Sequence, residues 1–79
     1  GNRANDGGGI YTPFTNPGTL TVRNTTVSNN VADFNGGGID NNIGLLTLVN
    51  STVTGNAAND GDGGGIDSGF GNSQFVIVN

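Results

Sequence analysis

The sequence predicts an all-β fold, a right-handed parallel β-helix (β-solenoid) of about three coils with three short strands in each coil. Three observations predict it: a tetrapeptide that recurs at nearly constant spacing, an alternating apolar segment after each copy, and a shortage of helix-forming residues. Equivalent positions are separated by 26 to 29 residues, a length that suits one solenoid coil. We therefore interpret residues 1–79 as a single solenoid segment.

Glycine-rich corners divide the chain into coils. Each corner reads Gly-Gly-Gly-Ile and follows a polar segment that returns the chain to the start of the next coil. Because glycine adopts backbone conformations that other residues resist, three in succession predict a tight turn or a close approach between coils. The corners are residues 7–10, 36–39 and 63–66, and the return segments are residues 1–6, 30–35 and 56–62.

Alternating apolar residues predict the core. Successive side chains of a strand point to opposite faces, so every second residue of these segments is expected to point inward. In the longest strand of each coil, the inward residues are Leu20 and Val22, Leu46 and Leu48, and Phe75 and Ile77. The next side is lined by Val27 and Val53, and the glycine corner is filled by Ile10, Ile39 and Ile66. Stacked coils would thus form aliphatic ladders.

Asparagines recur at two equivalent places in the coil. Asn tolerates left-handed backbone conformations, and a column of Asn side chains can hydrogen-bond from one coil to the next. We expect such ladders to hold the turns. The predicted ladder residues are Asn24, Asn50 and Asn79 at one corner and Asn2, Asn30 and Asn56 at another.

The outward side of the longest strand becomes more apolar along the chain. Thr and Arg occupy its outward positions in the first coil, whereas Leu and Val prevail in the later coils. An exposed aliphatic stripe can mark a contact surface and here suggests lateral association. The predicted contact face consists of Leu45, Val49, Val76 and Val78.

Composition excludes several classes of function. The net charge is −4 and the basic residues are Arg3 and Arg23, so binding to nucleic acid or to an anionic membrane is not expected, because both require a basic surface. No apolar run is long enough to span a bilayer. The sequence has no Cys and no His, which excludes disulfides and thiolate or imidazole zinc sites. Abundant Asn, Thr and Gly favour an exported, bacterial-type extracellular or cell-surface protein.

The repeat also resembles a known group. The pattern GGGI, a variable loop and then LTLVNSTVTGN, as the second coil reads, is similar to repeats of pectin-lyase-like right-handed β-helix proteins. It most resembles polymorphic outer-membrane adhesins and related bacterial surface proteins, and the resemblance covers nearly the whole chain. It implies the fold but leaves the activity open, because this architecture carries lyases, glycosidases, adhesins and inert stalks.

Two aspartates were considered as catalytic groups. Asp40 and Asp67 each follow the repeated Ile, so we expect them one coil apart, with about 5 Å between their backbones. Repulsion at this separation would raise the pKa of one carboxyl group, and a retaining glycosidase uses a similar separation. However, repeat symmetry alone places them there, Tyr11 takes the third equivalent position and the chain has no Trp to stack on a sugar. A turn residue that bonds its own backbone is the simpler interpretation, and no catalytic residue is predicted.

Ligand surfaces for calcium or ice are further alternatives. Asp60 and Asp62 are weak calcium candidates in a carbonyl-rich turn, to which Asp6 or Asp33 of neighbouring coils could add ligands. The closing Glu of an EF-hand and the nonapeptide order of calcium β-rolls are absent, and a solvated acidic turn is the simpler interpretation of these residues. An outward rank of hydroxyl groups resembles ice-binding solenoids, although Thr is also simply favoured in strands. This rank comprises Thr26, Ser28, Thr52 and Thr54.

We therefore expect a non-catalytic extracellular structural or adhesive β-solenoid segment that stacks coil on coil, as a stalk or as a subunit of an end-to-end filament. Its partners would be copies of itself or adjoining coils of a longer chain, with a carbohydrate or cell surface if it is adhesive. No cofactor is expected apart from the calcium alternative. The alternative functions are a fragment of a carbohydrate-active β-helix enzyme and an ice- or calcium-binding solenoid surface.

Overall fold

The structure, a computed structural model, describes residues 1–12, 18–68 and 73–78. The described residues form eleven strands and no helix. The first coil contains β1 (Arg3–Ala4), β2 (Ile10–Thr12), β3 (Gly18–Arg23) and β4 (Thr26–Ser28). The second contains β5 (Val31–Ala32), β6 (Ile39–Asn41), β7 (Gly44–Val49) and β8 (Thr52–Thr54). The third contains β9 (Ala57–Ala58), β10 (Ile66–Ser68) and β11 (Ser73–Val78).

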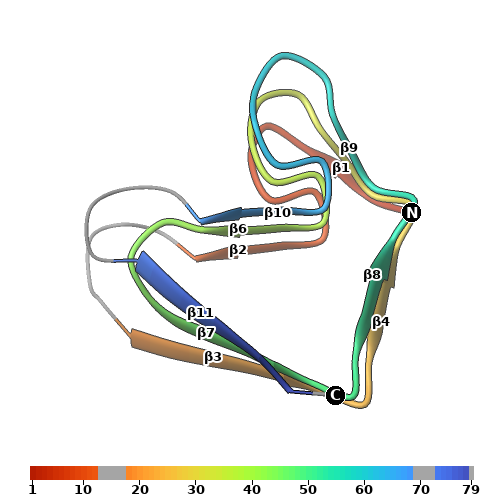
Figure 1. Cartoon of the computed structure of the whole chain (residues 1–79). Helices are drawn as coiled ribbons and strands as arrows, with labels where there is room; N and C mark the ends of the chain where they lie inside the picture. Colours follow the sequence, from red (N-terminus) through yellow and green to blue (C-terminus); the bar gives the residue numbers. More distant parts are fainter. Residues whose placement is uncertain (13–17, 69–72, 79) are drawn as a thin grey trace.

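Each strand pairs in parallel with its equivalent in the neighbouring coil, so that the chain winds over itself (Figure 1). The sheets have the strand orders β1-β5-β9, β2-β6-β10, β3-β7-β11 and β4-β8. This all-β, parallel arrangement is compatible with the predicted β-solenoid. The prediction of three strands per coil is wrong, because each return segment also carries a two-residue strand that pairs with the next return segment. The polar sequence of these segments had indicated only turns.

The aliphatic pattern sets the register of the longest strands. Leu48 of β7 lies between Val22 of β3 and Ile77 of β11. Val22 and Leu48 are 5% exposed, whereas Ile77 is 61% exposed. The ladder is therefore covered at β3 and β7 and open at β11. The buried cluster consists of Val22, Val27, Ile39, Leu46 and Leu48, with Ile10, Leu20, Val53 and Ile66 packed against it.

The glycine corners are tight for two reasons. Gly36 has a φ of 63°, a left-handed conformation that costs a residue with a Cβ about 1 kcal/mol or more. A Cβ on Gly37 would overlap the carbonyl oxygen of Gly64 in the next coil. The corner therefore combines a turn that needs a left-handed residue with a coil-to-coil approach that leaves no room for a side chain.

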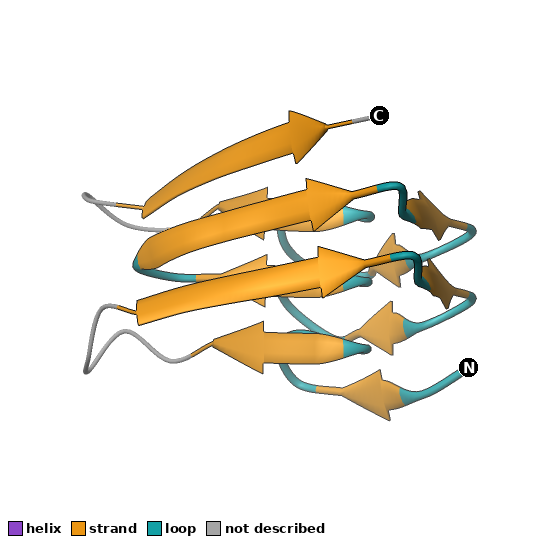
Figure 2. Ribbon diagram, turned by 90° about the horizontal axis from the view of Figure 1, so that it is seen from below, coloured by secondary structure: helices purple, strands orange, loops and turns teal. Residues whose placement is uncertain are grey.

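The coils form a shallow stack. Figure 2 shows the strands in successive levels, with the N-terminus at one end of the stack and the C-terminus at the other. The Cα atoms span 27 × 25 × 14 Å, and three levels at the usual strand spacing correspond to about 14 Å. The part of the chain that the structure describes has no helix of the length and hydropathy needed to cross a membrane.

Candidate functional site

A row of three residues crosses the sheet β2-β6-β10. Tyr11, Asp40 and Asp67 lie in register on its successive strands. Each follows the Ile of its glycine corner, so the alternation of side chains puts the row on the face opposite the core. Tyr11 is 46% exposed but Asp40 is only 2% exposed, and Asp67 is partly buried. An acidic side chain in the middle of this row is therefore shielded from water.

The glycine corner is what covers Asp40. The segment between β5 and β6 loops outward and folds back to the start of β6 (Figure 1), and the left-handed Gly36 brings its backbone against the aspartate. A Cβ on Gly36 would lie 2.5 Å from the Cβ of Asp40. The Asn42 side chain hydrogen-bonds to the carboxyl group, yet the Oδ1 atom of Asp40 has no hydrogen-bond partner among the described residues.

Burial dominates the electrostatics of this row. Desolvation raises the pKa of Asp40 from 3.8 to about 6, with a further increase from the charges of Asp67 and Asp6, while the hydrogen bond from Asn42 acts in the opposite direction. Burial also raises the pKa of Asp67, helped by the charges of Asp62 and Asp6. The like-charge repulsion predicted for Asp40 and Asp67 is thus present, but the loss of water is the larger cause.

A second polar column lies in the return segments, directly before the glycine triplets. The carboxylate of Asp6 accepts a hydrogen bond from the backbone N of Asn35 at 3.1 Å. The side-chain oxygen of Asn35 accepts one from the backbone N of Asp62 at 2.9 Å. At this position, an Asp or Asn side chain of one coil accepts a hydrogen bond from the backbone of the next coil. The position therefore stabilises the stack of coils.

The weak calcium candidates are not drawn into a cluster. Asp60 and Asp62 are both exposed, and the backbone N of Asp60 donates to the carbonyl oxygen of Asp33 at 2.9 Å. The carboxylate of Asp33 is itself paired with Arg3 at 2.6 Å. Within residues 1–12, 18–68 and 73–78, no group of three or more acidic, His or Cys side chains is arranged to hold a metal ion. The calcium interpretation therefore gains no geometric support.

The second predicted ladder, Asn2, Asn30 and Asn56, makes side-chain hydrogen bonds between coils. Asn30 donates from Nδ2 to the Oδ1 atom of Asn56 at 3.0 Å, and its backbone N donates to the same oxygen at 2.8 Å. Asn56 donates in turn to the carbonyl oxygen of Val27 at 2.9 Å. One coil lower, the backbone N of Asn2 donates to Oδ1 of Asn30 at 2.8 Å. This column therefore ties three coils together.

The first predicted ladder, at Asn24 and Asn50, differs from the prediction. Asn24 and Asn50 have φ values of 51° and 47°, and both side chains are exposed. No hydrogen bond between their side-chain amides is found in the described part of the chain, whereas their backbone N atoms donate to Val49 and Val78. The structure does not show the expected amide ladder between Asn24 and Asn50, which serve as left-handed corners. Asn79, the third predicted member, lies outside the described residues.

Two buried amides were not anticipated from the sequence. The side-chain oxygen of Asn41 accepts a hydrogen bond from the Thr12 hydroxyl at 2.9 Å, and Asn42 donates from Nδ2 to the carbonyl oxygen of Thr12 at 3.0 Å. They are 1% and 6% exposed and fix the turn between β6 and β7. The repeat gave no signal for them, because equivalent positions in the other coils do not carry an Asn pair.

The two predicted outer faces are only partly exposed. On the contact face, Val76 and Val78 are 47% and 48% exposed, but Leu45 and Val49 are partly buried. The apolar surface is thus concentrated on β11 rather than spread as a stripe. The hydroxyl rank lies on the sheet β4-β8, where three of its four members are exposed and Ser28 is partly buried.

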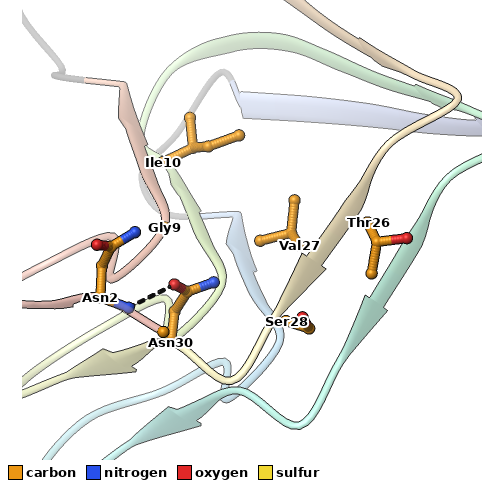
Figure 3. Close-up of a pocket in the computed structure, with 8 residues that line it drawn as sticks. Asn2, Gly9, Ile10, Thr26, Val27, Ser28 and Asn30 are labelled. Atoms are coloured by element: carbon orange, nitrogen blue, oxygen red, sulfur yellow. Dashed lines mark hydrogen bonds between the residues drawn. The ribbon is translucent and has the colours of Figure 1, made fainter.

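A cavity of about 300 Å³ opens beside β4 (Figure 3). Ile10 and Val27 form its apolar side, and Asn2 and Asn30 lie at its polar end (Figure 3). The remaining lining comes from Gly1, Gly9, Thr26 and Ser28. No ionisable side chain belongs to this lining, so the cavity and the aspartate row are separate features.

The chemistry that this arrangement supports is proton binding at Asp40, whose pKa is raised to about 6. A raised pKa is typical of a general acid, and the Asp40 side chain is only 2% exposed. Comparisons with protein-family models, with curated proteins and with solved structures gave no match for this chain.

Proposed function

We propose that this chain is a non-catalytic structural or adhesive segment of a right-handed parallel β-helix outside the cell. Its coils would stack on one another in a stalk or in an end-to-end filament. One observation carries the proposal: each strand pairs in parallel and in register with the equivalent strand of the neighbouring coil. Every edge of the stack is therefore a template for another coil of the same kind.

The two ends of the stack support this proposal. At β4, the carbonyl oxygen of Thr25 and the backbone N of Asn29 bond to β8. Because peptide groups alternate along a parallel strand, Thr26 and Ser28 direct theirs to the opposite edge, beside the cavity. At β11, Ile77 is 61% exposed above the buried Leu48. Another coil at either end would satisfy the backbone groups and bury apolar surface.

The size of the effect favours stacking. Full burial of an Ile side chain contributes about 1.5–3 kcal/mol, and each additional backbone hydrogen bond contributes about 0.5–1.5 kcal/mol. Adding a coil does not require further ordering of the return loop in the coil beneath it. Because each coil contacts only its neighbours, the free-energy gains at successive interfaces add along the stack. The partners implied are adjoining coils or copies of the same chain, and a carbohydrate or cell surface for an adhesive segment.

A tandem protein tests whether coils stack. Two copies of the chain would be joined by Ser-Thr-Val-Thr, the residues that follow Asn50 in the sequence, so that the linker can form the strand beside β4. We expect the tandem to unfold in one transition at a higher temperature than the single chain, by about 5 °C or more. A flexible Gly-Ser-Gly-Ser linker of equal length is the control. Equal melting temperatures for all three proteins would contradict the proposal.

Cryo-electron microscopy then distinguishes a filament from a stalk. An axial repeat of about 14 Å, three strand levels, is expected if the single chain stacks end to end. Isolated particles of the single chain, together with a stabilised tandem, would favour the stalk.

A further inference from the structure

Asp40 is an acidic residue without the usual compensation for burial. It sits on β6 at the centre of its sheet, 2% exposed, with one carboxyl oxygen that has no hydrogen-bond partner in the described part of the chain. A buried carboxylate normally requires a cation or several hydrogen bonds, because an ionised group is strongly destabilised away from water. A neutral carboxylic acid avoids most of this cost.

The groups that face Asp40 do not supply positive charge. Asp67 flanks it from β10 and Tyr11 flanks it from β2, while Asp6 acts on it from the segment between β1 and β2. Asn42, just after β6, provides a neutral hydrogen bond. The chain has two basic residues; Arg3 is paired with Asp33, and Arg23 is on β3, in a different sheet.

We propose that Asp40 is an acid-responsive lock between coils: its carboxyl group takes up a proton in mildly acidic solution, and the packing of β6 between β2 and β10 is strengthened. The lock acts inside a single chain, so it does not depend on stacking between chains. In a longer stack it would make the cohesion of the coils depend on pH.

The direction of the effect follows from the pKa. The pKa of Asp40 is about 6 in the folded chain against 3.8 for an ordinary Asp, so the folded state binds the proton more tightly than the unfolded state. The stabilisation from this group is therefore complete below pH 3.8 and is lost as the pH rises through about 6. Asp67, whose pKa is also raised, adds to the effect in the same direction.

The first experiment is a pH titration of the full chain followed by ¹³C NMR of the Asp carboxyl carbons. We expect the Asp40 signal to titrate with a midpoint near 6, well above the 3.8 of an ordinary Asp. The Asp67→Asn variant should lower the Asp40 midpoint, because one of the repelling charges has been removed. A midpoint for Asp40 near 3.8, the ordinary value for Asp, would overturn the proposal, whatever the stability of any variant.

The second experiment compares melting temperatures at pH 5 and pH 7.5 for the original chain, Asp40→Asn and Asp60→Asn. The original chain should melt at a lower temperature at pH 7.5, by about 5 °C or more. Asp40→Asn, which is neutral at both pH values, should lose most of this difference and melt higher than the original chain at pH 7.5. Asp60→Asn should keep the difference. An unchanged pH difference in Asp40→Asn would refute the lock.

Discussion

The Nδ2 atom of Asn30 donates to the Oδ1 atom of Asn56 across neighbouring coils at 3.0 Å. The same oxygen also accepts the backbone N–H of Asn30, so one side chain closes a small ring of hydrogen bonds between the coils. Among the described residues, no such bond joins Asn24 and Asn50, although both recur with the same period. Equal spacing in the sequence therefore corresponds to two physical roles, an inter-coil bond and a left-handed corner.

The two roles predict different responses to substitution. Asn56→Ala would leave the backbone N of Asn30 without its partner and would remove the hydrogen bond from Asn56 to the carbonyl oxygen of Val27, and we expect a loss of about 2 kcal/mol in the free energy of unfolding. Asn50→Gly should be neutral within about 0.5 kcal/mol, because Gly readily adopts its φ of 47°. Urea denaturation measures both values. Equal destabilisation by the two changes would show that the distinction is false.

Glycines at the corner and at the start of β3 form a second matched pair. Gly36→Ala should destabilise the chain by more than about 2 kcal/mol or prevent folding, since the new Cβ meets the Cβ of Asp40 at 2.5 Å on a residue with a φ of 63°. Gly18→Ala should be tolerated, because a Cβ at Gly18 meets no atom of the described residues within 4 Å. Circular dichroism and thermal melting would check this, and a stable, unshifted Gly36→Ala protein would contradict the packing described for the corner.

The parts of the fold that could be predicted from the sequence are those that repeat. Leu46 and Leu48 alternate with less buried residues, and the equivalent positions of the other coils are also apolar. The period of a strand was therefore sufficient to place them in the core. The strand Val31–Ala32 was missed because two residues are too short to show a period. Long ladders therefore leave a period in the residue pattern, and short ones do not.

The aspartate row shows a different limit. The repeat placed Asp40 one coil from Asp67, as the structure has them, but it gave no sign that the Asp40 side chain is buried. Its burial depends on how the corner at Gly36 folds back over the sheet, and that path is set by φ angles that the residue pattern does not encode. The buried pair Asn41 and Asn42 was missed for a related reason, because a turn unique to one coil has no repeat to reveal it.

The alternation of the longest strand gives a direct test of the core. Leu46 is fully buried, whereas its neighbour Leu45 is partly exposed on the opposite face. Leu46→Ala should cost about 2–5 kcal/mol, and Leu45→Ala should cost about 1 kcal/mol or less, since little apolar area is lost there. The free energies of unfolding in urea provide the comparison, and a larger loss for Leu45→Ala would mean that the assigned faces are reversed.

The exposed end of the aliphatic ladder predicts how stacking between chains can be blocked. Ile77 stands in register above Leu48 and is 61% exposed, so a coil placed on β11 would cover it. In Ile77→Lys the covered residue would be an unpaired ammonium group, whose burial costs several kcal/mol. We therefore expect end-to-end association, measured by sedimentation velocity over a concentration series, to weaken at least about tenfold, which corresponds to 1.4 kcal/mol.

Phe34→Lys is the control, because Phe34 is 50% exposed on a return loop of the middle coil and should leave association unchanged. Association that survives Ile77→Lys but is lost in Phe34→Lys would show that copies meet through the side of the stack and not through its end.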